Sequence, residues 1–197
     1  MKKIPTLFKR DFTKHGEIYD EYSDGTDWVL RGEGVATRKY DGTSVLIRDH
    51  KMYKRYELRP GKTAPADFEQ VDYDETTGKA VGWVQVGWGA EDKWFREAIE
   101  HHGANPDKVE LSDGTYELLG PKVQGNPEHA SEHYLQPHWL AESYPDVPTG
   151  FEELKALLSD KDIEGLVWHH PDGRMVKIKK KDYRLKRQPS QDQPHER

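Results

Sequence analysis

Cysteine is absent from this chain of 197 residues, and long apolar runs are absent as well. Without cysteine, disulfides and thiolate metal sites are excluded, and a reducing compartment is allowed. No apolar stretch approaches the roughly 20 residues that a membrane-spanning helix needs. The first ten residues are basic but lack the apolar core of a signal peptide. These absences predict a soluble, intracellular protein without a membrane partner.

The chain is also poor in hydrophobic residues, which at 34% only equal its charged residues. Ten Tyr, six Trp and five Phe nevertheless provide enough apolar surface to argue against general disorder. The length predicts one domain over residues 1–187. Residues 188–197 are polar, with no apolar side chain except two prolines, and are predicted to be disordered.

The net charge of −6 is distributed unevenly. Eight Lys or Arg and one Asp lie from Arg174 to Arg187, whereas residues 1–173 carry 21 basic and 33 acidic side chains. A basic strip on an acidic body suits an anionic substrate held on one face. A run of charge is also typical of a solvated terminus, so composition alone leaves both interpretations open.

Short β-prone runs dominate the chain. They are Gly34–Arg38, Ser44–Arg48, Met52–Leu58, Ala80–Gly87, Gly114–Leu119, Gly165–His169 and Met175–Lys179. Helical spacing appears at Glu91–His102 and after Thr149, whose spacing to Glu152 is that of a capping box. Residues 1–30 are predicted to be irregular or partly helical, and residues 59–79 to form a long loop. The pattern predicts an α+β domain of antiparallel sheets.

Lys39 and Gly42 stand at the end of the first of these β-prone runs, in the sequence Lys39-Tyr40-Asp41-Gly42. A lysine can act as a covalent nucleophile when burial or nearby positive charge lowers its pKa. Glycine lets the backbone approach another group closely. Asp-Gly is equally typical of an ordinary turn between two strands, so both interpretations remain open.

Glu117 lies in the strand predicted at Gly114–Leu119, where alternation places Tyr116 and Leu118 on the other face. Its carboxylate is suited to accept hydrogen bonds from sugar hydroxyls or to hold a metal-bound water. A solvent-facing glutamate is the alternative.

Glu164, Lys177 and Lys179 form the third candidate set. The period of two places both lysines on one face, and a turn centred on Pro171-Asp172 puts Glu164 nearly opposite Lys179. Lysines that neutralise phosphate and a carboxylate that holds a divalent ion suit a nucleoside triphosphate. The same lysines would favour a neutral amine on Lys39. An edge hairpin whose lysines prevent aggregation is the alternative.

Four motifs therefore follow one another along the chain, at Lys39–Gly42, Tyr116-Glu117, Glu164-Gly165 and Lys177–Lys179. In this order they resemble the covalent nucleotidyltransferases, namely ATP-dependent DNA and RNA ligases and mRNA capping enzymes. The chain is most similar to the vertebrate-type 5′-to-3′ RNA ligase family and its bacterial and viral relatives. The stretches that carry this likeness are Ala36–Gly42, Gly82–Val86, Glu117–Gly120, Gln124–Pro127 and Ile163–Lys179. The resemblance covers residues 33–181 and implies a nucleotidyltransferase domain with flanking helices.

The resemblance implies that Lys39 attacks the α-phosphate of ATP and carries AMP. Glu164 would organise Mg²⁺, with Mn²⁺ as an alternative, and Glu117 is a further metal candidate. Lys177 and Lys179 would hold phosphates. AMP would then pass to an RNA 5′-phosphate, from which a 3′-hydroxyl displaces it.

Other roles implied by the resemblance concern the nucleoside. Glu117 would contact the ribose, and Arg55 would contact the sugar or a phosphate. Gly42 would let the chain turn close to the nucleotide. His138 and Trp139 are the candidates for stacking on adenine.

Only 18 residues follow Lys179, so we expect no C-terminal OB domain. RNA contacts would then come from basic residues after the last motif, namely Lys180, Lys181, Arg184, Lys186 and Arg187. No obligate protein partner is inferred. A non-catalytic RNA-binding module and a GTP-using capping enzyme are the alternative functions. The His-x3-His spacing of His129 and His133 lacks a third ligand at a matching position, which disfavours a transition-metal site.

Overall fold

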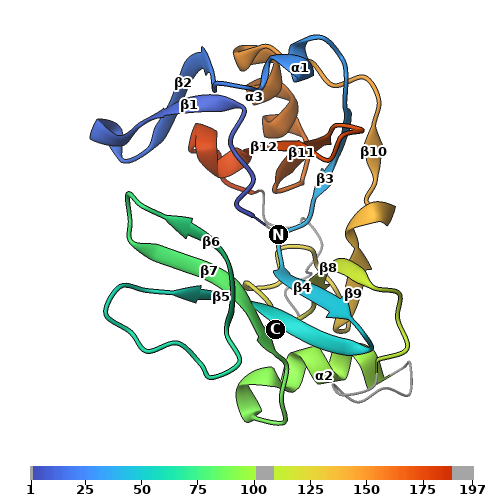
Figure 1. Cartoon of the computed structure of the whole chain (residues 1–197). Helices are drawn as coiled ribbons and strands as arrows, with labels where there is room; N and C mark the ends of the chain where they lie inside the picture. Colours follow the sequence, from blue (N-terminus) through green and yellow to red (C-terminus); the bar gives the residue numbers. More distant parts are fainter. Residues whose placement is uncertain (1, 101–108, 188–197) are drawn as a thin grey trace, which may run out of the picture. The chain divides into compact units, whose positions relative to one another are not determined.

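The chain folds into antiparallel sheets with few helices, which confirms the predicted α+β class (Figure 1). The computed structural model describes residues 2–100 and 109–187. The predicted polar tail and the C-terminal end of the predicted helix Glu91–His102 lie outside the described residues. No helix in these two ranges is long and apolar enough to cross a membrane.

The described residues divide into two compact units. Unit 1 consists of Asp41–Leu140 together with residues 2 and 3, and unit 2 consists of Ile4–Tyr40 and residues 141–187. The chain passes from unit 2 to unit 1 after Tyr40 and returns after Leu140. The single nucleotidyltransferase domain expected over residues 1–187 stays a prediction.

Within its described residues, unit 1 is built on one six-stranded sheet of order β6-β7-β5-β4-β8-β9, with every pair antiparallel. The strands are β4 (Thr43–Arg48), β5 (Lys51–Leu58), β6 (Glu69–Asp74), β7 (Lys79–Gln85), β8 (Gly114–Leu119) and β9 (Tyr134–Pro137). The helical segments are η2 (Ala90–Asp92), α2 (Lys93–Glu100) and η3 (His138–Leu140). Phe95, Ala98 and Ile99 of α2 are buried in one core with strand residues such as Val45 and Ile47, as helical spacing predicted.

Within its described residues, unit 2 contains a four-stranded sheet of order β10-β3-β11-β12 and a two-stranded sheet, β1-β2. The strands are β1 (Phe8–Asp11), β2 (Glu17–Tyr22), β3 (Val35–Lys39), β10 (Ser143–Tyr144), β11 (Gly165–His169) and β12 (Met175–Lys179). The helical segments are η1 (Phe12–Lys14), α1 (Asp27–Leu30), α3 (Phe151–Asp160) and η4 (Lys180–Tyr183). Leu154 and Leu158 of α3, one turn apart, share a core with Leu166 of β11 and Ile178 of β12.

The expectations for residues 1–30 and 59–79 were wrong in part. The first segment contains the β1-β2 hairpin and the single turn α1, and the second contains β6. In β2 only Ile18 is buried, and β6 has no buried residue. Strands that bury so little show almost no alternation of apolar and polar residues, so their sequences resemble loops.

The capping box proposed for Thr149 and Glu152 is also wrong. The residue before α3 is Gly150, and no side chain caps the first turn. The Thr149 carbonyl oxygen instead accepts a hydrogen bond from the Tyr22 hydroxyl at 3.0 Å.

The hairpin of β11 and β12 has the strand limits predicted from the sequence. Its register pairs Gly165 with Lys179, so the turn is centred on Asp172, half a residue from the predicted centre. The Asp172 carboxylate accepts a hydrogen bond from the Arg174 amide at 3.0 Å, and Gly173 adopts a φ of 92°.

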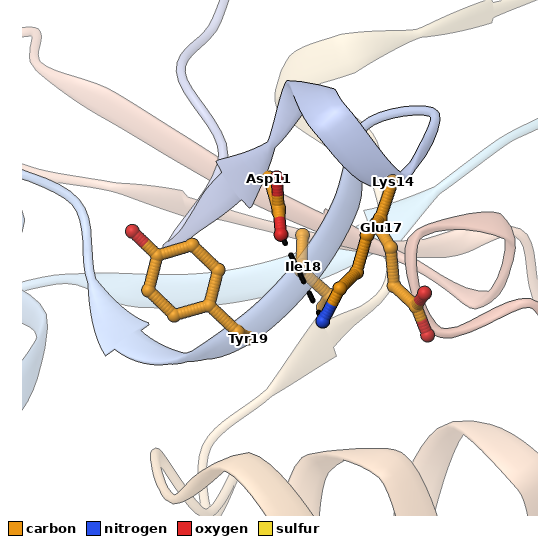
Figure 2. A pocket seen from close by; sticks show the side chains of 5 residues that line it. All are labelled: Asp11, Lys14, Glu17, Ile18 and Tyr19. Carbon is orange, nitrogen blue, oxygen red and sulfur yellow. Dashed lines mark ion pairs between the residues drawn. The ribbon is translucent and has the colours of Figure 1, made fainter.

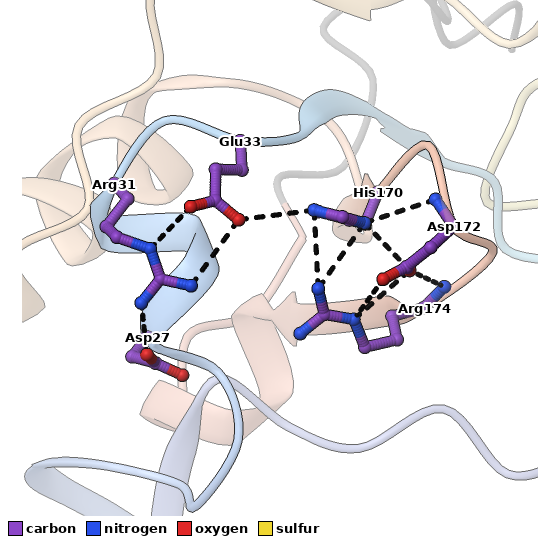
Figure 3. Close-up of polar contacts among 6 residues, drawn as sticks. All are labelled: Asp27, Arg31, Glu33, His170, Asp172 and Arg174. Atoms are coloured by element: carbon purple, nitrogen blue, oxygen red, sulfur yellow. Dashed lines mark hydrogen bonds and ion pairs between the residues drawn. The ribbon is translucent and has the colours of Figure 1, made fainter.

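A chain of charged side chains joins this turn to α1 (Figure 3). Glu33 lies between Arg31 and His170, at 2.5 Å from the Arg31 Nε and 3.2 Å from the His170 Nε2. The His170 Nδ1 lies 2.7 Å from an Asp172 oxygen. The network supports the end of the hairpin away from the lysines of β12.

Candidate functional site

Lys39, Gly165 and Lys179 form one row across β3, β11 and β12 of unit 2. Side chains of paired residues in antiparallel strands point to the same face, so the two lysines lie on either side of a glycine. A Cβ atom at Gly165 would lie 2.1 Å from the Ile178 carbonyl oxygen. The absence of a side chain there allows close strand packing and leaves room between the lysines.

The Glu164 carboxylate lies between these lysines. Its Oε2 atom is 2.5 Å from the Lys39 Nζ, and its Oε1 atom is 3.6 Å from the Lys179 Nζ. The backbone of Glu164 is held by the Lys180 amide, which donates to its carbonyl oxygen at 2.8 Å. The proximity of Glu164 and Lys179 expected from the sequence is therefore present, and Lys39 belongs to the same cluster.

Lys177 completes the cluster on the lysine-bearing face of β12, with Val176 and Ile178 buried on the other face. Burial, followed by repulsion from Lys179 and Lys39, lowers the pKa of Lys177 to about 8. Its ammonium group is thus about half protonated near pH 8. Burial is the main cause of this shift, and the smaller contributions of Lys179 and Lys39 reflect the positive charge that β3 and β12 bring together.

In unit 1, the Glu117 carboxylate is held from two directions. Its Oε1 atom accepts a hydrogen bond from the Gly42 amide at 3.1 Å, and its Oε2 atom lies 3.1 Å from the His138 Nε2. Only 8% of Glu117 is exposed, so the alternative of a solvent-facing glutamate is excluded. The two neighbours fix the carboxylate in one orientation.

His138 makes both of its ring contacts within this group. Its Nδ1 atom lies 2.9 Å from the Thr115 hydroxyl, which stands two residues before Glu117 on the same face of β8. The alternation of Thr115 and Glu117 was visible in the sequence, but the position of His138 beside them depends on the pairing of β8 with β9. These contacts support a positioning role for His138, and the stacking role on adenine stays a prediction.

Substitution of His138 distinguishes the two roles. If ATP binds beside Glu117, as the resemblance of the motifs implies, and His138 positions Glu117, His138→Phe should weaken ATP binding as much as His138→Ala, by roughly tenfold, because a buried carboxylate loses a hydrogen-bond partner. His138→Gln should retain most of the affinity, since its amide can still donate. Isothermal titration of the three variants provides the measurement. If Phe preserves the affinity and Gln does not, the ring stacks instead.

Gly42 makes its close approach to β8. A Cβ atom at this position would lie 2.2 Å from the Leu118 carbonyl oxygen and 2.9 Å from the Glu117 Cγ. The proximity to a nucleotide that was expected of Gly42 stays a prediction, whereas its packing against the strand that carries Glu117 is a feature of unit 1.

Arg55 pairs across the sheet with Trp83 of β7, and its guanidinium lies 5.4 Å from the centre of the buried indole ring. Burial lowers the pKa of Arg55. The aromatic face gives the cation a fixed platform in unit 1.

The basic residues after β12 differ in exposure. Lys181 and Arg184 are exposed, whereas Lys180 is only 2% exposed, which makes it unsuitable for a surface contact with RNA. Lys186 is also exposed, and the Arg187 Nε lies 3.2 Å from an Asp162 oxygen. Lys181 and Arg184 are therefore accessible to an anionic ligand.

The histidines do not build a metal centre in the part of the chain that the structure describes. There, no three His, Asp or Glu side chains are grouped in a way that could hold an ion. His133 is buried, with its Nδ1 atom 2.9 Å from Glu97 and its ring stacked on Trp94. A structural role explains these contacts.

Comparison with known proteins finds similarity to RNA ligases, as the sequence motifs do. No protein-family model matches the chain. Curated proteins named RNA ligase 1 do match. The mouse (Mus musculus) protein is 24% identical over 73% of this chain, and the rat (Rattus norvegicus) protein is 23% identical over 73% of it. The zebrafish (Danio rerio) protein is 23% identical over 77%.

The match covers only part of these relatives. It spans 65% of the mouse and rat proteins, just under two thirds of their length, and 68% of the zebrafish protein. At this level of identity, the comparisons support a link between this chain and RNA ligases.

Proposed function

We propose that this protein is an ATP-dependent RNA ligase with a nucleotidyltransferase fold, in which Lys39 carries AMP. The observation that carries the proposal is the cluster of Lys39 with Glu164, Lys177 and Lys179 in unit 2. Three cationic groups around one carboxylate suit a triphosphate, and the similarity to RNA ligase 1 proteins favours RNA as the strand to be joined.

In the first step, the Lys39 Nζ attacks the α-phosphorus of ATP. A nitrogen–phosphorus bond forms, the bond from the α-phosphorus to the bridging oxygen breaks, and pyrophosphate leaves while the amine gives up its proton. Lys177 and Lys179 would neutralise the charge that grows on the departing pyrophosphate.

In this proposal, the ion pair between Lys39 and Glu164 belongs to the enzyme before ATP binds. A carboxylate at 2.5 Å favours the ammonium form of lysine, which has no lone pair for attack. Lys39 must therefore lose its proton and its ion pair before it reacts. Glu164 is the side chain positioned to control both changes.

Glu164 also fits a role at Mg²⁺, because this ion is usually held by one or two carboxylates together with substrate phosphates and water. A bound Mg²⁺ would supply charge stabilisation at the phosphates. The Glu164 carboxylate lies at the lysine cluster, where phosphates would bind, so it meets this requirement.

In the later steps, an oxygen of the RNA 5′-phosphate would attack the phosphorus of lysyl-AMP, and Lys39 would leave and regain a proton. A 3′-hydroxyl would then attack the 5′-phosphorus, and AMP would leave. Contacts of Glu117 with the ribose and of Arg55 with the sugar or a phosphate follow from the resemblance of their motifs.

Intact mass spectrometry tests the proposal. Purified protein is first treated with pyrophosphate to remove any AMP already attached, and is then incubated with ATP or GTP and Mg²⁺. We expect the mass of one AMP to be added with ATP, and joining of RNA that carries 5′-phosphate and 3′-hydroxyl ends. Addition of GMP instead would favour a capping enzyme. RNA binding without any nucleotide addition would favour a non-catalytic RNA-binding module.

The pKa of Lys177 leads to a separate prediction. Bound phosphate stabilises the ammonium form, so nucleotide binding should raise this pKa from about 8 and draw in a proton. At pH 8 we expect an uptake of roughly half a proton per nucleotide. This proton uptake can be measured by calorimetry in buffers of different ionisation enthalpy. The ligand should be an ATP analogue that cannot be cleaved at the α-phosphate. The uptake should disappear in Lys177→Gln, and binding of wild-type protein without uptake would contradict the role.

A further inference from the structure

A hollow of about 440 Å³ lies in unit 2, between the turn of the β1-β2 hairpin and the end of β12 with η4. Among the described residues, its charged lining consists of Arg10, Lys179, Lys181 and Arg184 together with Glu17 and Asp182. The lining is therefore cationic on balance, in a chain whose net charge is −6. Such a surface favours an anionic ligand.

The inner wall of the hollow is built around Asp182, which is only 4% exposed. Its carboxylate accepts a hydrogen bond from the Arg10 guanidinium at 2.5 Å and from the Lys179 amide at 2.9 Å. Arg10 also donates to the Gly16 carbonyl oxygen at 2.8 Å. Because these bonds fix the Arg10 guanidinium, the cation is held in place before any ligand arrives.

The outer rim is easier to rearrange. The Arg184 side chain is 60% exposed and pairs with Glu17, 39% exposed, at 2.8 Å. An ion pair so accessible to water contributes little to stability, so a phosphate can replace Glu17 at Arg184 at small cost. Lys181 on the same rim is also exposed.

Lys179 connects the hollow to the lysine cluster. It lines the hollow, and its Nζ atom lies 3.6 Å from Glu164, which contacts Lys39. The hollow and the Lys39 cluster thus share Lys179. Transfer of AMP requires a 5′-phosphate close to the lysine that carries it.

A second hollow, of about 360 Å³, lies against the same hairpin and shares Glu17 with the first (Figure 2). Tyr19 and Lys14 lie on its walls, and the Lys14 Nζ is 3.9 Å from an Asp11 oxygen. Tyr19 is 41% exposed, which leaves an aromatic surface available beside the cationic hollow. Exposed aromatic side chains stack on the bases of single-stranded nucleic acids. The triphosphate of a nucleotide has no base at that position and would not need such a surface.

We propose that the hollow of Arg10, Lys179, Lys181 and Arg184 binds the phosphates at the 5′ end of the RNA strand, with the adjoining base against Tyr19. The proposal rests on the proposed function in one respect, namely that RNA is the strand to be joined. It adds the β1-β2 hairpin, outside all of the motifs, to the surface that recognises the substrate.

The test measures binding of a 3′-labelled single-stranded RNA by fluorescence anisotropy without ATP, with either a 5′-phosphate or a 5′-hydroxyl. We expect Lys181→Ser combined with Arg184→Ser to lower the affinity about tenfold, the effect of one to two lost charged contacts. The slope of log affinity against log salt should fall by about 0.7 to 1.4. The preference for 5′-phosphate should also diminish.

Two further variants separate a lost contact from a damaged fold. Glu17→Gln removes the competing carboxylate and should tighten RNA binding about threefold, a gain that misfolding cannot produce. Lys51→Ser combined with Lys62→Ser removes the same charge from exposed positions in unit 1 and should have a smaller effect.

Tyr19→Ala should weaken RNA binding about tenfold through lost stacking on the base.

Equal losses in the two double variants, or unchanged RNA binding in Lys181→Ser with Arg184→Ser, would overturn the proposal. Weaker ATP binding with unchanged RNA binding would assign the hollow to the nucleotide instead. The proposed function fails by a separate measurement, the absence of AMP addition to wild-type protein.

Discussion

Lys39→Ala is expected to abolish covalent attachment of AMP, with a loss of at least about a thousandfold in the rate of its formation. Alanine supplies no nucleophile, and no neighbouring lysine occupies the position of the Lys39 amine at the end of β3. Intact mass spectrometry after incubation with ATP and Mg²⁺ measures the effect. Joining of ordinary 5′-phosphorylated RNA should be lost together with the protein adduct.

Two controls make this result specific to the amine. Lys39→Arg keeps a cation beside Glu164, so it should remain folded and should still fail to attach AMP, because guanidinium stays protonated. Lys155→Ala removes a lysine from α3 of the same unit and should attach AMP at the wild-type rate. An adduct that survives in Lys39→Ala would assign the nucleophile to another residue.

Gly42→Ala is expected to lower the free energy of unfolding of unit 1 by about 3 kcal/mol, the upper end of overpacking effects. Its Cβ atom would lie 2.2 Å from the Leu118 carbonyl oxygen, and this oxygen belongs to the backbone of β8, whose pairing with β4 leaves little room for relief. The displacement should also disturb the hydrogen bond from the Gly42 amide to Glu117. Urea unfolding, followed by tryptophan fluorescence, measures the change in stability.

Gly87→Ala is the matched control in the same unit. The atom nearest to its Cβ position is an Asp92 oxygen at 3.8 Å, an ordinary van der Waals contact. Since alanine restricts the unfolded chain, this variant should be as stable as wild type or slightly more so. A destabilisation of the same size at both glycines would show that the close contact with β8 does not set the requirement for Gly42.

The parts of the fold that could be predicted are those with strong periodicity. In β12 the buried Val176 and Ile178 alternate with Lys177 and Lys179, as the period of two required. The helix α2 likewise buries three of the four apolar residues that helical spacing places on one face, namely Phe95, Ala98 and Ile99, whereas the fourth, Trp94, is only partly buried. By contrast, β1, β2, β6 and β9 have few buried side chains, and their pairing partners rather than their own sequences make them strands.

The candidate site was predictable only where its residues are close in sequence or in register. The approach of Glu164 to Lys179 follows from one hairpin, so it could be anticipated. The burial of Glu117 between Gly42 and His138 depends on β8 pairing with β4 on one side and with β9 on the other. Single-sequence patterns carry no information about such long-range neighbours, which is why a solvent-facing glutamate remained an alternative.

The pairing of β3 with β10 makes Asp41–Leu140 an insertion between two neighbouring strands of unit 2. These strands are antiparallel neighbours, with Ala36 opposite Tyr144 and the Arg38 amide donating to the Glu142 carbonyl oxygen at 2.8 Å. The chain therefore leaves unit 2 at the end of β3 and re-enters it at the start of β10. These two strands are paired like those of a β-hairpin, with Asp41–Leu140 in the place of the turn. A two-residue Asn-Gly turn could join β3 directly to β10. The shortened protein would keep the residues of the lysine cluster and of the hollow at the β1-β2 hairpin.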